Sequence, residues 1–324
     1  KDKEMRSFDM LQSNAINCVR GNAARAIARL LWDDSSLFEQ FKDTIEKLAL
    51  DENPAVKLAS LYALWPSYNI ARDWASEIIL NLYEQDYRLA GFYGTRNMLF
   101  FLYPENRERV LEIIKKCYES EDEKLIEMGA YCLAEMFIRN NEFVDVMNNV
   151  NEMSEIQAKS VLQMTIVYFN DDEFNSLVKD IILKFKISSL NVAMPILKLL
   201  YDNLINLERD KDFLIEILSS NLGHTIVHEF IDYLKEESKS VVDYKDIILS
   251  TSYDLVERGY GKNEGIWGIE NEIAKLIIGL YDETSGSQIP EMKNIANECL
   301  DIWDLMYEKQ IGQIRLLSQK LMDR

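Results

Sequence analysis

The only two histidines in the chain have a spacing that zinc sites use. His224 and His228 are four positions apart and Asp232 follows four positions later, so the three side chains share one face of a helix. Two imidazoles and a carboxylate are ligands that zinc accepts. The order differs from the H-E-x-x-H metalloprotease motif, and no cysteine or third histidine is nearby in the sequence. These three residues are the candidate metal site of the sequence. The preferred interpretation is nevertheless an ordinary helix face without a metal.

A second segment of chemical interest is the loop at 259–265, which contains Gly-x-Gly-Lys. A phosphate-binding P-loop needs G-x-x-x-x-G-K followed by Ser or Thr, whereas Asn263 follows the lysine here. The sequence also has no nucleophile elbow and no kinase signature. We therefore predict no catalytic residue and no cofactor, and we interpret the loop as a connection between helices.

Carboxylates gather in short clusters at 33–34, 121–123 and 171–173. Each cluster lies just before or at the start of a predicted helix. Acidic side chains there accept hydrogen bonds from the free N–H groups of the first turn and interact favourably with the helix dipole. We predict helix caps at these clusters rather than the paired acids of a hydrolase.

Aromatic side chains are densest between residues 65 and 93. Aromatic residues are enriched at binding hot spots, but they also fill the cores of repeat proteins. We expect most of this cluster to pack inside the protein. The members that a partner is expected to reach are Trp65, Tyr68 and Trp74.

Polar residues on the second helix of each predicted pair are further candidates for partner contacts. They are Lys57, Arg88, Arg96 and Glu127. Three arginines on one early helix could also contact an acidic partner, although surface arginines commonly stay solvated or pair within the chain. They are Arg20, Arg25 and Arg29.

The elements that position these residues are predicted to be helices throughout. Apolar residues recur three and four positions apart in segments of about 12 to 20 residues. The chain has only 12 Gly and 5 Pro, which are too few for the turns of an all-β fold. Pro54 is expected in the first turn of a helix, where its missing N–H costs nothing.

Aspartate turns recur at an almost constant interval. Asp51, Asp86 and Asp122 are 35 and 36 residues apart, and each is expected to open the second helix of a pair. Further second helices are predicted near Ser154 and Ser188. Small residues on the first three would let neighbouring helices approach closely: Ala59, Ala90 and Ala130. Two helices repeated at this period are typical of a solenoid.

The repeat resembles the HEAT repeat over about residues 13 to 210, although other helical-repeat families share this period. The shared pieces are an amphipathic first helix, an acidic turn with Asn or Pro, and a second helix of the type Val/Ile-basic-x-Ala. The resemblance implies an all-α, HEAT-like α-α superhelix, a solenoid of about six to eight helical hairpins. We expect a repeat array over 1–220 and atypical terminal repeats and a cap over 221–324, continuous with the array.

The segments Val19–Ile27 and Cys299–Met306 resemble the C-terminal HEAT-like region of large bacterial STAND and NACHT NTPases. In that family an upstream NTPase and an effector respond to what the repeats detect, often in anti-phage defence. The helix expected at 15–31 has the pattern of a second helix without its first, so we expect more protein upstream. The resemblance implies that this chain is the sensing or autoinhibitory end.

The charge of the chain limits its partners. The net charge is −19, from 36 Lys and Arg against 55 Asp and Glu. Nucleic acid and anionic membrane surfaces are disfavoured because both attract basic faces, although a local basic groove stays possible. A protein partner with a basic surface is expected instead. Four scattered cysteines and the lack of a long apolar segment predict a reducing, cytoplasmic location.

These observations together predict a protein-binding scaffold or sensor module that is not itself an enzyme. The alternative is a HEAT-like nucleic-acid-processing or metal-dependent enzyme, which would need a basic groove or a complete set of metal ligands.

Overall fold

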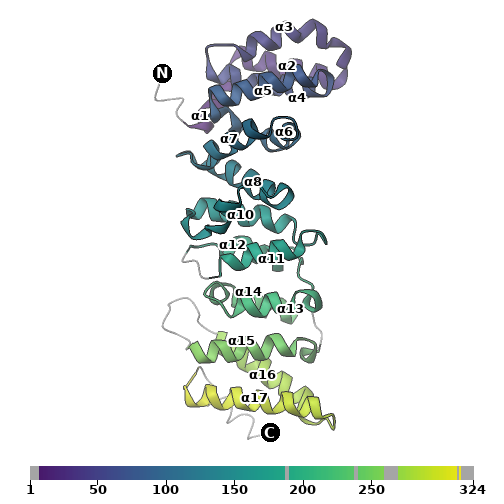
Figure 1. Cartoon of the computed structure of the whole chain (residues 1–324). Coiled ribbons are helices and arrows are strands. Elements are labelled where there is room, and N and C mark those ends of the chain that lie inside the picture. The colour runs from purple at the N-terminus through teal and green to yellow at the C-terminus, as the bar shows by residue number, and fades with distance from the viewer. Residues whose placement is uncertain (1–6, 187–189, 237–239, 259–268, 312–313, 315–324) are drawn as a thin grey trace. The chain divides into compact units, whose positions relative to one another are not determined.

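The computed structural model describes residues 7–186, 190–236, 240–258, 269–311 and 314. Within them the chain forms α-helices α1 to α17 and short 3-10 helices η1 to η4, and it forms no strand (Figure 1). The predicted all-α class is confirmed for this part of the chain. The loop predicted at 259–265 lies outside the described residues.

The chain divides into two compact units, residues 1–164 and 165–324. The division falls within α10, whereas the sequence predicted a change of character at 220–221, between α13 and α14. The predicted repeat array over 1–220 stays a prediction.

The first unit contains the following elements: α1 (Phe8–Asn17), α2 (Val19–Asp33), η1 (Ser35–Leu37), α3 (Phe38–Ala49), α4 (Pro54–Ile70), α5 (Arg72–Gln85), η2 (Tyr87–Gly91), α6 (Thr95–Leu102), α7 (Arg107–Tyr118), α8 (Glu123–Asn140), α9 (Val144–Asn148), η3 (Val150–Glu152) and the start of α10 (Glu155–Val167). Helices that are next but one along the chain pack side by side, for example α2 beside α4 and α5 beside α7. One layer contains α3, α5 and α7, and the other contains α2, α4, η2 with α6, and α8.

Polar side chains cap two of the predicted second helices, although Asn53 rather than Asp51 caps the first of them. Asn53 Oδ1 accepts a hydrogen bond from Ala55 N at 2.9 Å, and Pro54 occupies the first turn of α4. Asp122 Oδ1 caps α8 by accepting from Lys124 N at 3.0 Å. Its other oxygen accepts from Phe8 N at 2.9 Å, so the same carboxylate also holds the start of α1.

Two predicted helices have different boundaries in the structure from those that the sequence predicted. Residues 15–31 are not one helix, because α1 ends at Asn17, Cys18 is extended, and α2 begins at Val19. The Cys18 sulfur accepts a hydrogen bond from Gly21 N at 3.2 Å and serves as the cap. Asp86 caps the short 3-10 helix η2 rather than an α-helix, and α6 begins only at Thr95.

The second unit contains the end of α10 and the following elements: α11 (Asn175–Lys184), α12 (Ala193–Tyr201), α13 (Leu207–Leu218), α14 (Gly223–Glu236), η4 (Val241–Tyr244), α15 (Lys245–Arg258), α16 (Ile269–Ser285) and α17 (Pro290–Glu308). The same two-layer packing recurs. One layer contains α11, α13, α15 and α17, and the other contains α12, α14 and α16. In Figure 1 this unit runs from teal to yellow in successive rows of helices.

A buried ion pair connects α11 with α13, which are neighbours in one layer of the second unit. Asp210 on α13 has no exposed side-chain surface, and its carboxylate meets Lys179 Nζ and Arg209 Nε, each at 2.7 Å. Asn206 N donates to the same carboxylate at 2.9 Å. Burial raises the pKa of Asp210, but the hydrogen bonds from Arg209, Lys179 and Asn206 outweigh it, so the pKa lies below its ordinary value.

None of the described helices combines the length and the apolar character that a bilayer span requires.

Candidate functional site

Four aromatic rings from α4 and the turn after η2 form one cluster in the first unit, which we call the aromatic face. They are Tyr62, Trp65, Phe92 and Tyr93. Trp65 and Tyr93 are stacked, with ring centroids 5.8 Å apart and planes 12° apart. Phe92 is buried beneath them and lies 4.5 Å from Tyr93. Tyr93 itself is 71% exposed, so the outer ring of a packed cluster is open to solvent.

The backbone at Gly94 is what allows Trp65 to lie flat on this turn. A β-carbon at Gly94 would fall 1.1 Å from Trp65 Cζ3, so the indole occupies the space that any other residue would need. The glycine is buried, and it directly precedes α6. Gly94 therefore allows the indole to lie beside the exposed tyrosine that precedes it in the sequence.

Arginine from α2 extends the aromatic face. Arg25 Cζ lies 5.8 Å from the centroid of the Tyr62 ring, within the range of a cation–π contact. Partial burial raises the pKa of Tyr62, and the charge of Arg25 offsets part of that rise. Tyr62 in turn lies 5.8 Å from Tyr93, so the cation and the rings are continuous.

The same helical layer continues to α8 through polar pairs. Arg96 on α6 donates to both carboxylate oxygens of Glu135 on α8, at 2.8 and 3.2 Å. Tyr131 on α8 donates to Gln163 Oε1 on α10 at 2.5 Å. The guanidinium of Arg139 lies 4.5 Å from the Phe100 ring. The contacts of Arg96 and Arg139 thus join α6 to α8, and that of Tyr131 joins α8 to α10.

The structure brings together only some of the predicted partner-binding residues. Trp65 and Arg96 lie on this layer, and Lys57 lies near the start of α4, where it donates to Gln85 Oε1 at 3.1 Å. Arg88 is held by Asp86 through two hydrogen bonds, at 2.7 and 2.6 Å. Glu127 is exposed on α8.

Two other aromatic candidates are not on the aromatic face. Tyr68 was expected to be accessible, but its ring is buried against Phe101 and its hydroxyl donates to the Phe101 carbonyl at 3.3 Å. Trp74 lies on α5, in the other layer, edge-on to Phe38 at 5.3 Å. The sequence did not single out Tyr93, which is the most exposed ring of the cluster.

The candidate metal row lies on α14. His228 Nδ1 is 3.3 Å from Asp232 Oδ2, and both side chains are more than half exposed. The side chain of His224 lies outside the described residues. Among the described residues no group of three His, Cys, Asp or Glu side chains has metal-binding geometry.

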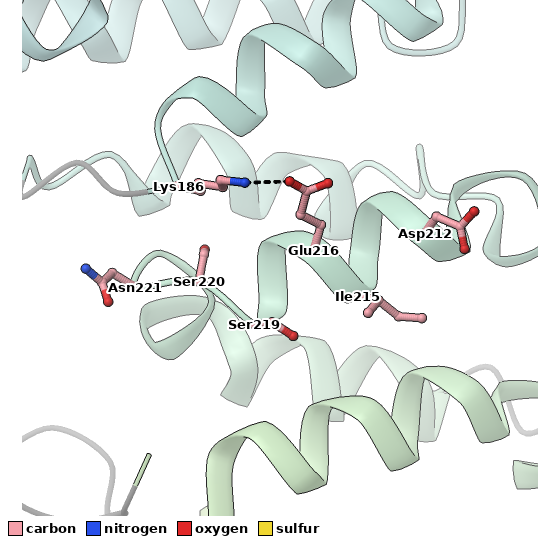
Figure 2. Close-up of a pocket in the computed structure, with 7 residues that line it drawn as sticks. All are labelled: Lys186, Asp212, Ile215, Glu216, Ser219, Ser220 and Asn221. Carbon is pink, nitrogen blue, oxygen red and sulfur yellow. Dashed lines mark hydrogen bonds and ion pairs between the residues drawn. The ribbon is translucent and has the colours of Figure 1, made fainter. Parts of the chain in front are cut away.

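The pockets of the second unit are open to solvent and lined by a mixture of charged, polar and apolar side chains. One of about 540 Å³ is lined by Lys186, Asp212, Ile215, Glu216 and residues 219–221. Figure 2 shows Lys186 and Glu216 pointing toward each other, and their charged atoms are 2.6 Å apart. Lys186 and Glu216 therefore neutralise each other, and Asp212 adds a second carboxylate to the lining.

A second pocket, of about 650 Å³, lies between α15 and α17 and is strongly acidic. Its carboxylates are Asp246, Asp254, Glu257, Glu298 and Asp301. Lys211 pairs with Asp246 at 2.9 Å, and Lys309 lies 3.5 Å from Glu257. The lining of this pocket therefore carries an excess of negative charge, and the basic partner predicted from the total charge stays a prediction.

No protein-family model matches the chain, and no curated protein or solved structure is significantly similar to it. The candidate site therefore rests on the geometry of this chain alone.

Proposed function

We propose that the chain is a non-catalytic protein-binding module and that the aromatic face of the first unit is its binding surface. The observation that carries this proposal is the position of Tyr93, which is 71% exposed although it packs against three other rings. The paired helices of each unit would belong to a HEAT-like array, in which neighbouring pairs bury each other's apolar sides.

Two features of such a surface favour binding: its apolar area, which a partner buries, and the fact that its side chains are already ordered before binding. Removing an exposed aromatic ring from water on binding lowers the free energy of the complex. Trp and Tyr are enriched among the residues that dominate binding energy. Trp65 and Tyr93 are already stacked in the free protein. A partner therefore does not bear the full cost of immobilising these side chains.

The resemblance of Val19–Ile27 and Cys299–Met306 to the C-terminal region of STAND and NACHT NTPases supports a sensor role in the bacterial cytoplasm. In this proposal the binding event on the aromatic face would control an NTPase located upstream in the same polypeptide. Such a module needs no cofactor of its own.

Selection from a phage-displayed random peptide library on the immobilised chain tests the proposal. Peptides enriched on the wild type are titrated against a Trp65→Ala/Tyr93→Ala variant. Most of these peptides are expected to lose at least about tenfold in affinity, as for hot-spot residues. The matched control is Tyr201→Ala, which removes a tyrosine of similar exposure from the second unit.

The proposal fails if no enriched peptide distinguishes the double variant from the wild type while both proteins stay folded. Circular dichroism and a thermal melt establish the folded state of each variant. Peptides that lose affinity for the Tyr201 variant instead would assign binding to the second unit.

A further inference from the structure

The part of the helical layer that carries the aromatic face, namely α2, α4, η2 and α6, has a charge opposite to that of the chain. The segments 19–33, 54–70 and 87–102 contain six cationic residues and only one carboxylate, Asp33. The cations are Arg20, Arg25, Arg29, Lys57, Arg88 and Arg96. The formal charge of the three segments is thus +5, in a chain whose total is −19. The total charge is therefore a poor guide to the partner of this face.

Half of these cations are neutralised by carboxylates of the chain. Arg20 pairs with Asp51, and Arg96 and Arg88 form the pairs with Glu135 and Asp86 described above. The other three have no carboxylate within 4.0 Å among the described residues: Arg25, Arg29 and Lys57. An excess of positive charge consequently remains on this layer.

One of the unneutralised arginines contacts the aromatic face, and a second lies one turn further along the same helix. Arg25 and Arg29 are four residues apart on α2, so they share one face of the helix. Arg25 lies over the Tyr62 ring, and Tyr62 contacts Tyr93. A guanidinium that rests on a ring keeps its N–H groups available for a carboxylate. The surface thus offers one guanidinium held on the rings and a second cation one helical turn away, beside the exposed ring of Tyr93.

We infer that the aromatic face binds an acidic segment of a partner protein. Carboxylates of the segment would pair with Arg25 and Arg29, and an apolar or aromatic side chain would pack on Tyr93. This inference rests on the proposed function and names the chemistry of the partner. The charge complementarity of the layer is what selects an acidic segment over a basic one.

Nucleic acid fits the same surface less well. Backbone binding depends on several phosphate contacts, each of which releases counterions. Only three cations of α2, α4, η2 and α6 lack a carboxylate partner among the described residues, which is few for a polyanion that gains affinity with each phosphate contact. A short acidic peptide requires only one or two of these contacts.

The test uses the Tyr93-dependent peptides from the random library as probes. They are expected to be enriched in Asp and Glu and depleted in Lys and Arg. An Arg25→Gln/Arg29→Gln variant is expected to bind them about tenfold or more weakly, and the wild-type affinity is expected to fall with added salt. The matched control is Lys42→Gln/Lys47→Gln, which removes two positive charges from α3, including Lys42 over the Trp74 ring.

Neutral or basic Tyr93-dependent peptides, or unchanged affinity in the arginine variant, would overturn the inference and leave the proposed function intact. Loss of Tyr93 dependence altogether would overturn the proposed function itself. A single-stranded DNA oligonucleotide is the competing probe. If it binds more tightly than the acidic peptides and needs Arg25 and Arg29, the partner is nucleic acid and the inference is wrong.

Discussion

Trp65 lies directly against Gly94, with its indole in the space that a β-carbon at position 94 would occupy. The indole is stacked on Tyr93 at the same turn. The exposure of Tyr93 and the position of Trp65 therefore depend on one backbone position. This relationship makes the aromatic face sensitive to a single methyl group.

Gly94→Ala is expected to displace Trp65 because the added β-carbon would fall 1.1 Å from Cζ3. The expected results are a loss of about 1–3 kcal/mol in the free energy of unfolding, as for overpacking, and a loss of binding of the Tyr93-dependent peptides. Urea unfolding and peptide titration measure the two effects.

The matched control is Gly286→Ala, because a β-carbon there meets no atom within 4 Å. It is expected to leave both stability and peptide binding unchanged within about 0.5 kcal/mol. Wild-type peptide affinity in the Gly94 variant would contradict the assigned role of the indole.

Asp210→Asn is expected to be among the most destabilising single changes in the second unit. It removes the charge that both Lys179 and Arg209 contact, in a side chain with no exposed surface. Breaking a buried pair costs about 3 kcal/mol or more. Denaturant unfolding followed by circular dichroism measures the loss.

Asp246→Asn is the control for Asp210, since it breaks the Lys211–Asp246 pair, in which both side chains are nearly half exposed. Exposed pairs contribute about 0–1 kcal/mol. Equal losses in the two variants would show that burial does not set the strength of these ion pairs.

The stabilisation by Asp210 is expected to disappear in acid. The folded-state pKa of Asp210 lies below 3.8, the value expected for the unfolded chain, so the unfolded chain binds the proton more tightly. The contribution is therefore fully present above pH 3.8 and is lost as the pH falls through the folded-state pKa. The difference in unfolding free energy between wild type and Asp210→Asn should be constant near neutrality and shrink below about pH 4. A difference that grows in acid would contradict this account.

Native alkylation is expected to modify one cysteine of four. Cys18 is half-buried, whereas Cys117, Cys132 and Cys299 are buried. Burial raises the pKa of Cys117 and Cys299 to about 12, and it raises that of Cys132 further above the ordinary range. Because the thiolate is the reacting form, these three thiols should react with iodoacetamide only after unfolding. Mass spectrometry of the alkylated peptides separates the two groups, and rapid native labelling of Cys117 would contradict the burial.

Helix starts with ordinary caps could be predicted from the sequence. Pro54 and Asp122 begin α4 and α8 as expected because their side chains favour helix starts. The break at Cys18 was missed because a thiol is not a usual cap, and the apolar pattern runs through it unchanged. The 3-10 helix η2 was missed although Gly91 and Gly94 disfavour a continuous α-helix there.

The candidate site could be predicted only in part. The sequence indicated an aromatic cluster containing Trp65, but a helical pattern does not show which ring of a cluster faces water. The exposure of Tyr93 follows from the turn between η2 and α6. Likewise, the three arginines of α2 were apparent, but the contact of Arg25 with Tyr62 joins residues far apart in the sequence.

Site-specific photo-crosslinking at residue 93 tests the central claim most directly. Tyr93 is replaced by p-benzoylphenylalanine, and in a parallel protein Tyr201 is replaced, because both side chains are exposed. The account predicts that peptides selected on the wild type crosslink at position 93, at residues mapped by mass spectrometry, and not at position 201. Crosslinking at position 201 alone, or equally at both positions, would contradict it.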